Sequence, residues 1–241
     1  MLNYDREAAH YDETRGGEPR GEAAAAAIAE LLPAGAATLL DVACGTGIVT
    51  GHISRPGLTV FGADLSAGMA RYAATRLEGR VLLANCTALP IATGSLDAVS
   101  AIWLLHLIDH VPAMMAEAAR VLRPGGTVIL TVEKDASHNA EDIGELTLSY
   151  RRKEASDDFA AVRDCGARLG LAYAGETAFI GHGQGRTPRK TADAVRSGYF
   201  RSALALRDGD ADTLAASLDA LPAPQERRPD PIYRLIALRR G

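Results

Sequence analysis

The central part of the chain alternates short apolar runs with segments of helical periodicity. The apolar runs are TLLDVA (38–43), LTVFGAD (58–64), RVLLAN (80–85), LDAVSAIW (96–103) and GTVILTV (126–132). Between them, SAGMARYAATRLEG (66–79) and HVPAMMAEAARVLRPGG (110–126) have helical spacing. Ser66 is a candidate N-cap, and Gly79 is a candidate stop signal. Strands that alternate with helices in this way are typical of a parallel sheet covered on both faces.

The flanking segments add helices and two further strands. Residues 4–32 predict a short polar helix, a break at Gly16 and Gly17, and an Ala-rich helix. Residues 138–170 and 191–221 predict more helices, whereas 171–183 and the PIYRLIALRR segment predict strands. We therefore predict an α/β fold, a doubly wound Rossmann-like sheet of seven strands within a single domain over 1–241. In it, residues 1–34 form a helical lid, 35–135 the ligand-binding core, and 136–241 helical insertions with the last two strands.

Composition narrows the class of protein. The chain is 47% hydrophobic and 23% charged with a formal net charge of -4, which is ordinary for a globular protein. Its three cysteines fit neither a disulfide framework nor a metal site, so we expect no metal and a reducing, cytoplasmic location. The apolar stretch at 23–42 contains Glu30 and Pro33, so we expect neither a signal peptide nor a membrane span. Because basic residues form no concentrated stripe, we expect no nucleic-acid partner.

The segment LLDVACGTG (39–47) carries the clearest chemical signal. An apolar strand ends in Asp41 and runs into Gly45 and Gly47, which let the backbone turn tightly and approach a ligand. The helix that follows offers unpaired N–H groups to an anionic group. A dinucleotide fingerprint would need glycine where this chain has Thr50, which disfavours a nicotinamide enzyme. Asp64 closes the second strand, where a carboxylate can accept both hydroxyls of a ribose.

With the segment VLLANCTALPIATGSLDAV (81–99), these motifs resemble class I S-adenosylmethionine (SAM) methyltransferases. The similarity covers about residues 35–135 and is greatest to the type 11, ubiquinone-biosynthesis-like branch that acts on small molecules. The matching pieces are DVACGTG, GADLS, ANCTALP, WLLHLI and EAARVLRPGGTVIL. Two positions depart from the family pattern: Ala43 replaces its usual first glycine, and Asn85 replaces its commoner aspartate.

The resemblance implies SAM as the cofactor. It places Gly45 and Gly47 against the methionine part, Asp41 at the amino group, Asp64 at the ribose, and Asn85 with the Cys86 N–H at the adenine. Asn85 can accept a hydrogen bond from the adenine amino group through its amide oxygen. The full set of cofactor candidates is Tyr11, Arg15, Asp41, Ala43, Gly45, Gly47, Asp64, Leu65, Asn85, Cys86, Thr87 and Ala101. In the lid, Tyr11 and Arg15 either reach the methionine carboxylate or are exposed helix residues.

Acceptor chemistry requires a positioned nucleophile and, for acidic acceptors, a base. The catalytic candidates are His106, His182 and Glu133, and the substrate-binding candidates are Trp103, His138 and Arg186. GHGQGRTPRK (181–190) joins glycines to several donors without an acid, which suits a carboxylate or phosphate on the acceptor. For each histidine, a packing or surface role is the alternative.

These observations predict a SAM-dependent methyltransferase that methylates an oxygen or nitrogen of a small molecule, and we expect this acceptor to be a secondary metabolite with an anionic group. Two alternatives stay open: a tRNA or protein methyltransferase, and a non-catalytic SAM-binding module. An NAD-dependent oxidoreductase is a third alternative, which Thr50 and the adenine segment disfavour. We expect a small-molecule acceptor as the partner, no membrane, and a monomer or homodimer.

Overall fold

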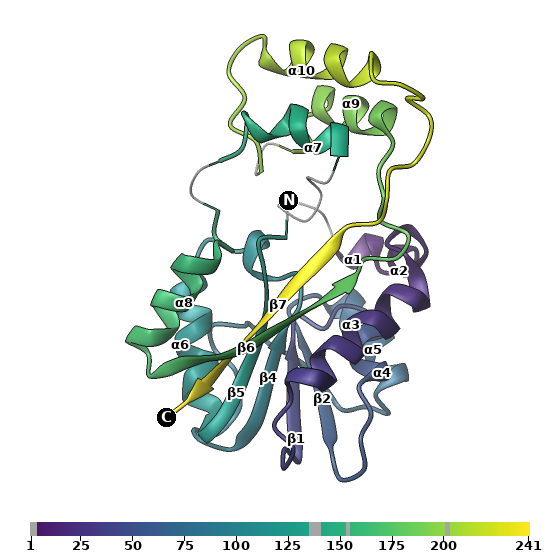
Figure 1. The fold of residues 1–241 in the computed structure, drawn as a ribbon. Coiled ribbons are helices and arrows are strands. Elements are labelled where there is room, and N and C mark those ends of the chain that lie inside the picture. Colours follow the sequence, from purple (N-terminus) through teal and green to yellow (C-terminus); the bar gives the residue numbers. More distant parts are fainter. Residues whose placement is uncertain (1–3, 135–140, 153–154, 201–202) are drawn as a thin grey trace.

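The fold was analysed in a computed structural model (Figure 1), which describes residues 4–134, 141–152, 155–200 and 203–241. His138, one of the substrate candidates, lies outside these residues. Within the described part, none of the helices is long and apolar enough to cross a membrane.

A seven-stranded sheet forms the centre of the molecule. Its strands are β1 (Thr38–Val42), β2 (Thr59–Asp64), β3 (Val81–Leu83), β4 (Leu96–Ala101), β5 (Leu122–Val132), β6 (Leu171–Ile180) and β7 (Ile232–Arg240). Their order is β3-β2-β1-β4-β5-β7-β6, and the first five are parallel, whereas β7 runs antiparallel between β5 and β6. The predicted doubly wound sheet of seven strands is confirmed.

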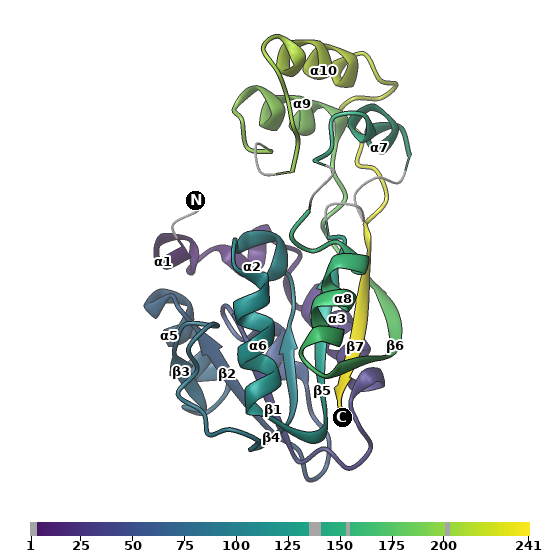
Figure 2. The same cartoon turned by 90° about the vertical axis from the view of Figure 1, so that its left-hand side faces the viewer.

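Helices cover both faces because neighbouring strand residues point to opposite sides. The helices of the core are α3 (Gly17–Leu31), α4 (Ile48–His52), α5 (Ala67–Arg76), α6 (Val111–Val121) and α8 (Phe159–Arg168). On one face Leu40 packs in a cluster with Met114 of α6, and on the other Leu39 packs with Ile28 of α3. Figure 2 shows α6 and α8 along the same side of the sheet.

Local signals set the ends of these elements. The Ser66 hydroxyl accepts a hydrogen bond from the Met69 N–H at 3.1 Å, so the predicted N-cap of α5 is confirmed. Strand β5 begins at Leu122, earlier than the predicted 126, and its Arg-Pro-Gly-Gly segment forms a bulge in which Gly125 has a φ of 81°. There Leu122 pairs with Leu96 before the register shifts, so a segment with a typical turn sequence joins the sheet.

A small helical cap lies beyond the carboxyl ends of the parallel strands. It consists of α7 (Glu141–Leu148), α9 (Pro188–Arg196) and α10 (Asp210–Asp219), and Figures 1 and 2 show these helices grouped apart from the sheet. They have an apolar core of their own, which includes Ile143, Val195 and Leu214. The cap therefore covers the edge of the sheet where ligands of α/β folds bind.

The N-terminal segment forms the helices that its sequence predicts. Short helices α1 (Tyr4–Glu7) and α2 (Tyr11–Thr14) precede α3, and Gly16 has a φ of 98° between α2 and α3. A side chain does not fit at this turn, because a Cβ on Gly16 would meet the His182 carbonyl oxygen at 1.9 Å. The break at Gly16 is thus required by close packing against the segment after β6.

Candidate active site

The turn after β1 opens toward the carboxyl edge of the sheet. Ala43, Gly45 and Gly47 have φ values of 57°, 59° and 77°, all in the left-handed region. A Cβ on Gly45 would meet nothing within 4 Å, so the backbone there faces open space. The Gly45 N–H donates to the Asp64 carboxylate at 2.8 Å, which joins this turn to the end of β2. Burial raises the pKa of Asp64 although backbone N–H groups of Ser66 and Gly45 stabilise its charge.

Asp41 lies beneath this turn and is fully enclosed. Its carboxylate accepts hydrogen bonds from the hydroxyls of Thr50 and Ser100, at 2.5 and 2.6 Å. Burial raises its pKa to about 6, against the effect of these hydroxyls. Asp41 thus ties β1 to β4 and α4, and its contact with the amino group of SAM stays a prediction. Thr50, the residue that breaks the dinucleotide fingerprint, has a structural role here.

Asn85, predicted to bind adenine, follows β3, and Leu65, another cofactor candidate, follows β2. The Asn85 side-chain oxygen accepts from both the N–H and the hydroxyl of Thr87, each at 3.0 Å. Because these two bonds occupy the oxygen, we expect Asn85 to present its amide N–H groups to a ligand rather than accept from the adenine amino group. Leu65 is 72% exposed next to Asp64 and offers apolar surface there.

Two carboxylates hold the N-terminal helices against these turns. Asp5 accepts from the Ser66 hydroxyl at 2.6 Å and from the Gly68 N–H at 2.7 Å. Asp12 accepts from the Thr46 hydroxyl at 2.6 Å and pairs with Arg76 at 2.9 Å. Thr46 belongs to the β1 turn, so the segment 4–20 is fastened over both turns. The predicted lid was residues 1–34, but α3 packs against the sheet, so only the segment 4–20 is called the lid below. Sequence reasoning missed Asp5 and Asp12, since an exposed acid in a short helix gives no distinguishing signal.

Arg20 is a second residue that sequence reasoning missed. It is only 4% exposed, and its Nε atom has no hydrogen-bond partner among the described residues. Its guanidinium lies 4.1 Å from the centre of the Trp103 ring, and the indole Nε1 of Trp103 is likewise buried without a partner. Two unpaired donors at one place are costly unless a ligand accepts from them. An arginine just ahead of the run GEAAAAAIAEL is the one sequence signal that could have pointed to it.

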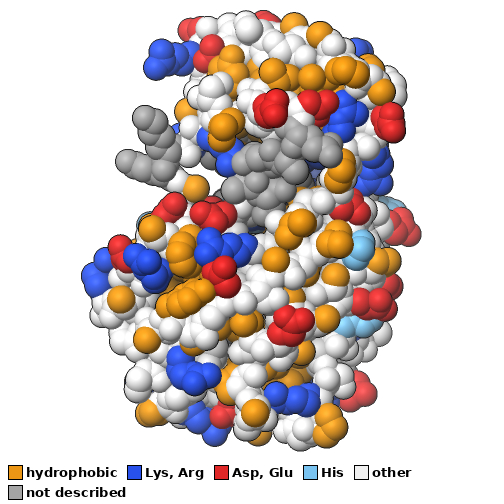
Figure 3. Space-filling model, in the orientation of Figure 1, with side chains coloured by type: hydrophobic (Ala, Val, Ile, Leu, Met, Phe, Trp, Pro, Cys, Tyr) orange, Lys and Arg blue, Asp and Glu red, His pale blue; other side chains and the backbone are white. Residues whose placement is uncertain are grey.

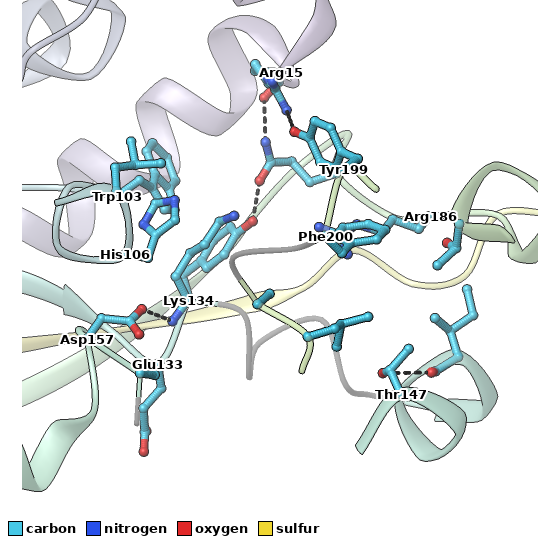
Figure 4. A pocket seen from close by; sticks show the side chains of 18 of the residues that line it. Arg15, Trp103, His106, Glu133, Lys134, Thr147, Asp157, Arg186, Tyr199 and Phe200 are labelled. Atoms are coloured by element: carbon cyan, nitrogen blue, oxygen red, sulfur yellow. Dashed lines mark hydrogen bonds between the residues drawn. The ribbon is translucent and has the colours of Figure 1, made fainter. Parts of the chain in front are cut away.

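A cleft of about 1770 Å³ separates the cap from the core and the lid. The lining residues with predicted roles are Tyr11, Arg15, Trp103, His106, Glu133 and Arg186. Trp103 has a φ of 55°, and its ring packs edge-on against Tyr233 with a centroid distance of 5.4 Å. His106, in the turn Leu105–Leu107, lies beside Trp103 (Figure 4). Ala101 ends β4 beneath them and is fully buried.

Comparison with known proteins identifies a known domain in the central part of the chain. Residues 40–130 match the family model described as a methyltransferase domain, of type 11. The ubiquinone/menaquinone biosynthesis C-methyltransferase UbiE of Syntrophotalea carbinolica is 38% identical over 112 residues, 44% of this chain and 47% of that protein. Residues 40–130 are a type 11 methyltransferase domain. The match of this segment, with the S-adenosylhomocysteine complex of a structural neighbour, indicates SAM as the cofactor.

Other relatives differ in what they act on. A malonyl-[acyl-carrier protein] O-methyltransferase of Hahella chejuensis is 38% identical over 96 residues, 38% of this chain and 34% of that protein. The chain thus spans less than half the length of these curated relatives. Geranyl diphosphate C-methyltransferase from Streptomyces coelicolor A3(2) has the same fold, with a TM-score of 0.53, 18% identity, and coverage of 90% of this chain and 75% of that one.

The remaining candidate residues lie outside the matched segment 40–130. Glu133 pairs with Arg234 at 3.1 Å and points away from the other labelled side chains (Figure 4), an arrangement that disfavours it as a base. His182 does not belong to the lining of the cleft, and its carbonyl packs against Gly16. Arg186 lines the cleft with its guanidinium 4.7 Å from the centre of the Phe200 ring.

The 181–190 loop also has a structural role, because hydrogen bonds attach it to neighbouring segments. Gln184 accepts from the Tyr233 hydroxyl and donates to the Arg15 carbonyl at 3.1 Å, which attaches the loop to the lid. Asp230 accepts from the N–H groups of Gly183 and Gly185 at 3.0 and 2.7 Å. The loop is therefore held from both sides, and Arg186 extends from a fixed backbone into the cleft.

Proposed function

We propose that the protein is a SAM-dependent methyltransferase that methylates an oxygen or nitrogen of a small molecule bearing an anionic group. The cleft supports this proposal, because it opens between the lid and the cap and contains Arg15, Arg20 and Arg186. Guanidinium groups bind carboxylates and phosphates through paired N–H donors. The geranyl diphosphate enzyme of the same fold acts, by its name, on an anion.

SAM supplies an activated methyl group, so the protein mainly has to bind, orient and exclude water. The open space above Gly45 fits a close backbone approach, and Asp64, which is joined to Gly45 by a hydrogen bond, would accept ribose hydroxyls. Arg20 fits the methionine carboxylate, since its buried Nε has no acceptor among the described residues. His106 would take the proton of an acidic acceptor from its place beside Trp103.

A small acceptor is favoured over tRNA or protein because the cap, with a core of its own, lies over the cleft. On the face in Figure 3, the described residues place Lys and Arg among Asp and Glu rather than in one stripe. A nucleic-acid face is usually a concentrated basic patch.

Arg20→Gln tests the cofactor assignment. We expect SAM and S-adenosylhomocysteine to bind about ten- to a hundredfold more weakly, the usual loss of a hydrogen bond to a charged group. The stability of the ligand-free protein should be unchanged or higher, because the variant removes a buried charge that has no acid partner within the described residues. Titration calorimetry and urea unfolding measure the two effects. Arg123→Gln, which breaks an exposed pair with Asp97, is the control. Unchanged affinity in Arg20→Gln would show that the carboxylate lies elsewhere.

Turnover distinguishes the enzyme from a binding module. The protein, SAM and separate small-molecule, tRNA and protein fractions of a cell extract are incubated, and S-adenosylhomocysteine is measured. We expect product with the small-molecule fraction. Product with tRNA or protein alone contradicts the small-molecule assignment, and SAM binding without product from any fraction supports the non-catalytic alternative.

A further inference from the structure

Aromatic side chains are concentrated in the cleft. The chain has one tryptophan, seven tyrosines and four phenylalanines, and half of these twelve residues line it. They are Tyr4, Tyr11, Trp103, Tyr199, Phe200 and Tyr233. Tyr4 and Tyr11 belong to the lid, Trp103 and Tyr233 to the core, and Tyr199 and Phe200 to the segment between α9 and α10 of the cap. Rings therefore face the cleft from all three parts that enclose it.

Cationic side chains gather around one of these rings. Arg15 donates to the Tyr199 hydroxyl at 3.5 Å across the cleft, from the lid to the cap (Figure 4). Burial alone would raise the pKa of Tyr199, yet the hydrogen bond from Arg15 and the charges of Arg15, Lys134 and Arg186 hold it below the usual range. Arg15, Lys134 and Arg186 all line the cleft, and their charges favour negative charge on the Tyr199 oxygen.

Two of the cations are stacked on rings. The Arg186 guanidinium lies 4.7 Å from the centre of the Phe200 ring, and that of Arg15 lies 5.6 Å from the centre of the Tyr11 ring. A guanidinium on an aromatic face extends a flat surface and directs its N–H donors sideways, toward an anion in the same plane. Such pairs suit a ligand that is itself flat and charged.

Several acids of the cleft wall have structural partners. Asp157 accepts from the Lys134 backbone N–H at 2.8 Å, and Asp158 accepts from the Ala161 N–H at 2.8 Å as the N-cap of α8. Glu133 pairs with Arg234, which lies outside the lining. Each of these carboxylates therefore has a partner among the residues of the core.

We propose that the methyl acceptor is a planar aromatic anion, such as a hydroxylated aromatic acid, whose ring packs among Tyr11, Tyr199 and Phe200 and whose charge is met by Arg15, Lys134 and Arg186. This inference rests on the proposed function and narrows its anionic acceptor to an aromatic one. An aliphatic anion would make no ring–ring contact in the cleft, and a neutral aromatic compound would gain nothing from the positive charge of Arg15, Lys134 and Arg186.

The test measures binding to the protein saturated with S-adenosylhomocysteine. Salicylate and 1-hydroxy-2-naphthoate are titrated by calorimetry, each beside its neutral amide, and cyclohexanecarboxylate serves as the aliphatic anion. We expect at least one aromatic acid to bind about tenfold more tightly than its amide and than cyclohexanecarboxylate. Trp103, the one tryptophan of the chain, reports by its fluorescence whether binding occurs in the cleft.

Arg186→Gln and Arg189→Gln form a matched pair of variants. Arg189 is near in sequence, but its guanidinium pairs with Asp219, and Arg189 is not part of the cleft lining. Arg186→Gln should weaken the aromatic acid about tenfold and leave its amide and S-adenosylhomocysteine unchanged, whereas Arg189→Gln should change none of them. Phe200→Leu should weaken acid and amide alike, because it removes ring contact and no charge.

The outcomes separate this inference from the proposed function. If S-adenosylhomocysteine binds but the aromatic acids bind no better than their amides or cyclohexanecarboxylate, the aromatic anion is wrong and the methyltransferase assignment stands. Equal losses in Arg186→Gln and Arg189→Gln also overturn it. If S-adenosylhomocysteine does not bind, the proposed function fails and this inference fails with it.

Discussion

Asp41 shows how one buried carboxylate links stability to pH. Its pKa in the folded protein is about 6, above its ordinary 3.8, because burial opposes the charge. The neutral form of Asp41 contributes fully to the free energy of unfolding below pH 3.8, and this contribution is lost as the pH rises through about 6. Asp41→Asn should therefore stabilise the protein at pH 7.5, by up to roughly 3 kcal/mol, and much less at pH 4.5. Urea unfolding at both pH values measures this, and an equal difference at both would contradict it.

Ala43 offers a second single-residue test. Its φ of 57° is costly for a residue with a Cβ, by roughly 1–2 kcal/mol, and glycine adopts it without strain. Ala43→Gly should raise the free energy of unfolding by about 1 kcal/mol. Ala63→Gly is the control: Ala63 is a buried residue of β2 outside the positive-φ set, so that glycine should destabilise. A loss of stability in Ala43→Gly would show that the turn is unstrained.

For single residues, the sequence predicted the location of a side chain best where the end of a strand determines it. Asp64 and Asn85 follow strand ends, so their placement at the edge of the sheet could be predicted. Glu133 follows a strand end too, but its partner Arg234 lies on β7, and only the folded register brings them together. Arg20 was missed because burial of a helical arginine depends on which face of α3 packs against Trp103.

At the scale of elements, the lid is expected to control cofactor exchange. Asp12 contacts both Thr46 of the β1 turn and Arg76 of α5, so Asp12→Asn weakens two contacts at once. We expect S-adenosylhomocysteine to dissociate about five- to tenfold faster, since a loss of 1–1.4 kcal/mol corresponds to such a factor. Stopped-flow fluorescence of Trp103 measures the rate.

Asp164→Asn is the matched control, because it breaks an exposed pair with Arg163 on α8. An unchanged dissociation rate in Asp12→Asn would mean that the lid does not cover the bound cofactor. The helices of the lid were predictable from their polar pattern and the Gly16–Gly17 break, but the contacts of Asp5 and Asp12 were not. Each joins residues far apart in the sequence, and only packing of the lid on α5 and the β1 turn determines them.

For the whole molecule, the sheet and the cap have separate apolar cores, which gives them unequal stability. The clusters on both faces of the sheet contain most of its buried residues, whereas the cap depends on a smaller cluster that includes Ile143, Val195 and Leu214. Regions with few buried apolar contacts open at lower free energy. We therefore expect backbone amides of α7, α9 and α10 to exchange with solvent faster than those of β1, β4 and β5, as measured by hydrogen exchange with mass spectrometry.

Cofactor and acceptor should slow hydrogen exchange in two different parts of the molecule, because we propose that the acceptor binds between the cofactor and the cap. S-adenosylhomocysteine should slow exchange in the β1 turn and the lid, because we propose that Gly45, Asp64 and Arg20 bind it there. An aromatic acid added afterwards should slow exchange around Tyr199 in the cap, since Arg15 and Tyr199 approach each other at that point. Protection of the cap by S-adenosylhomocysteine alone would contradict this division, because it would place the cofactor, rather than the acceptor, against the cap.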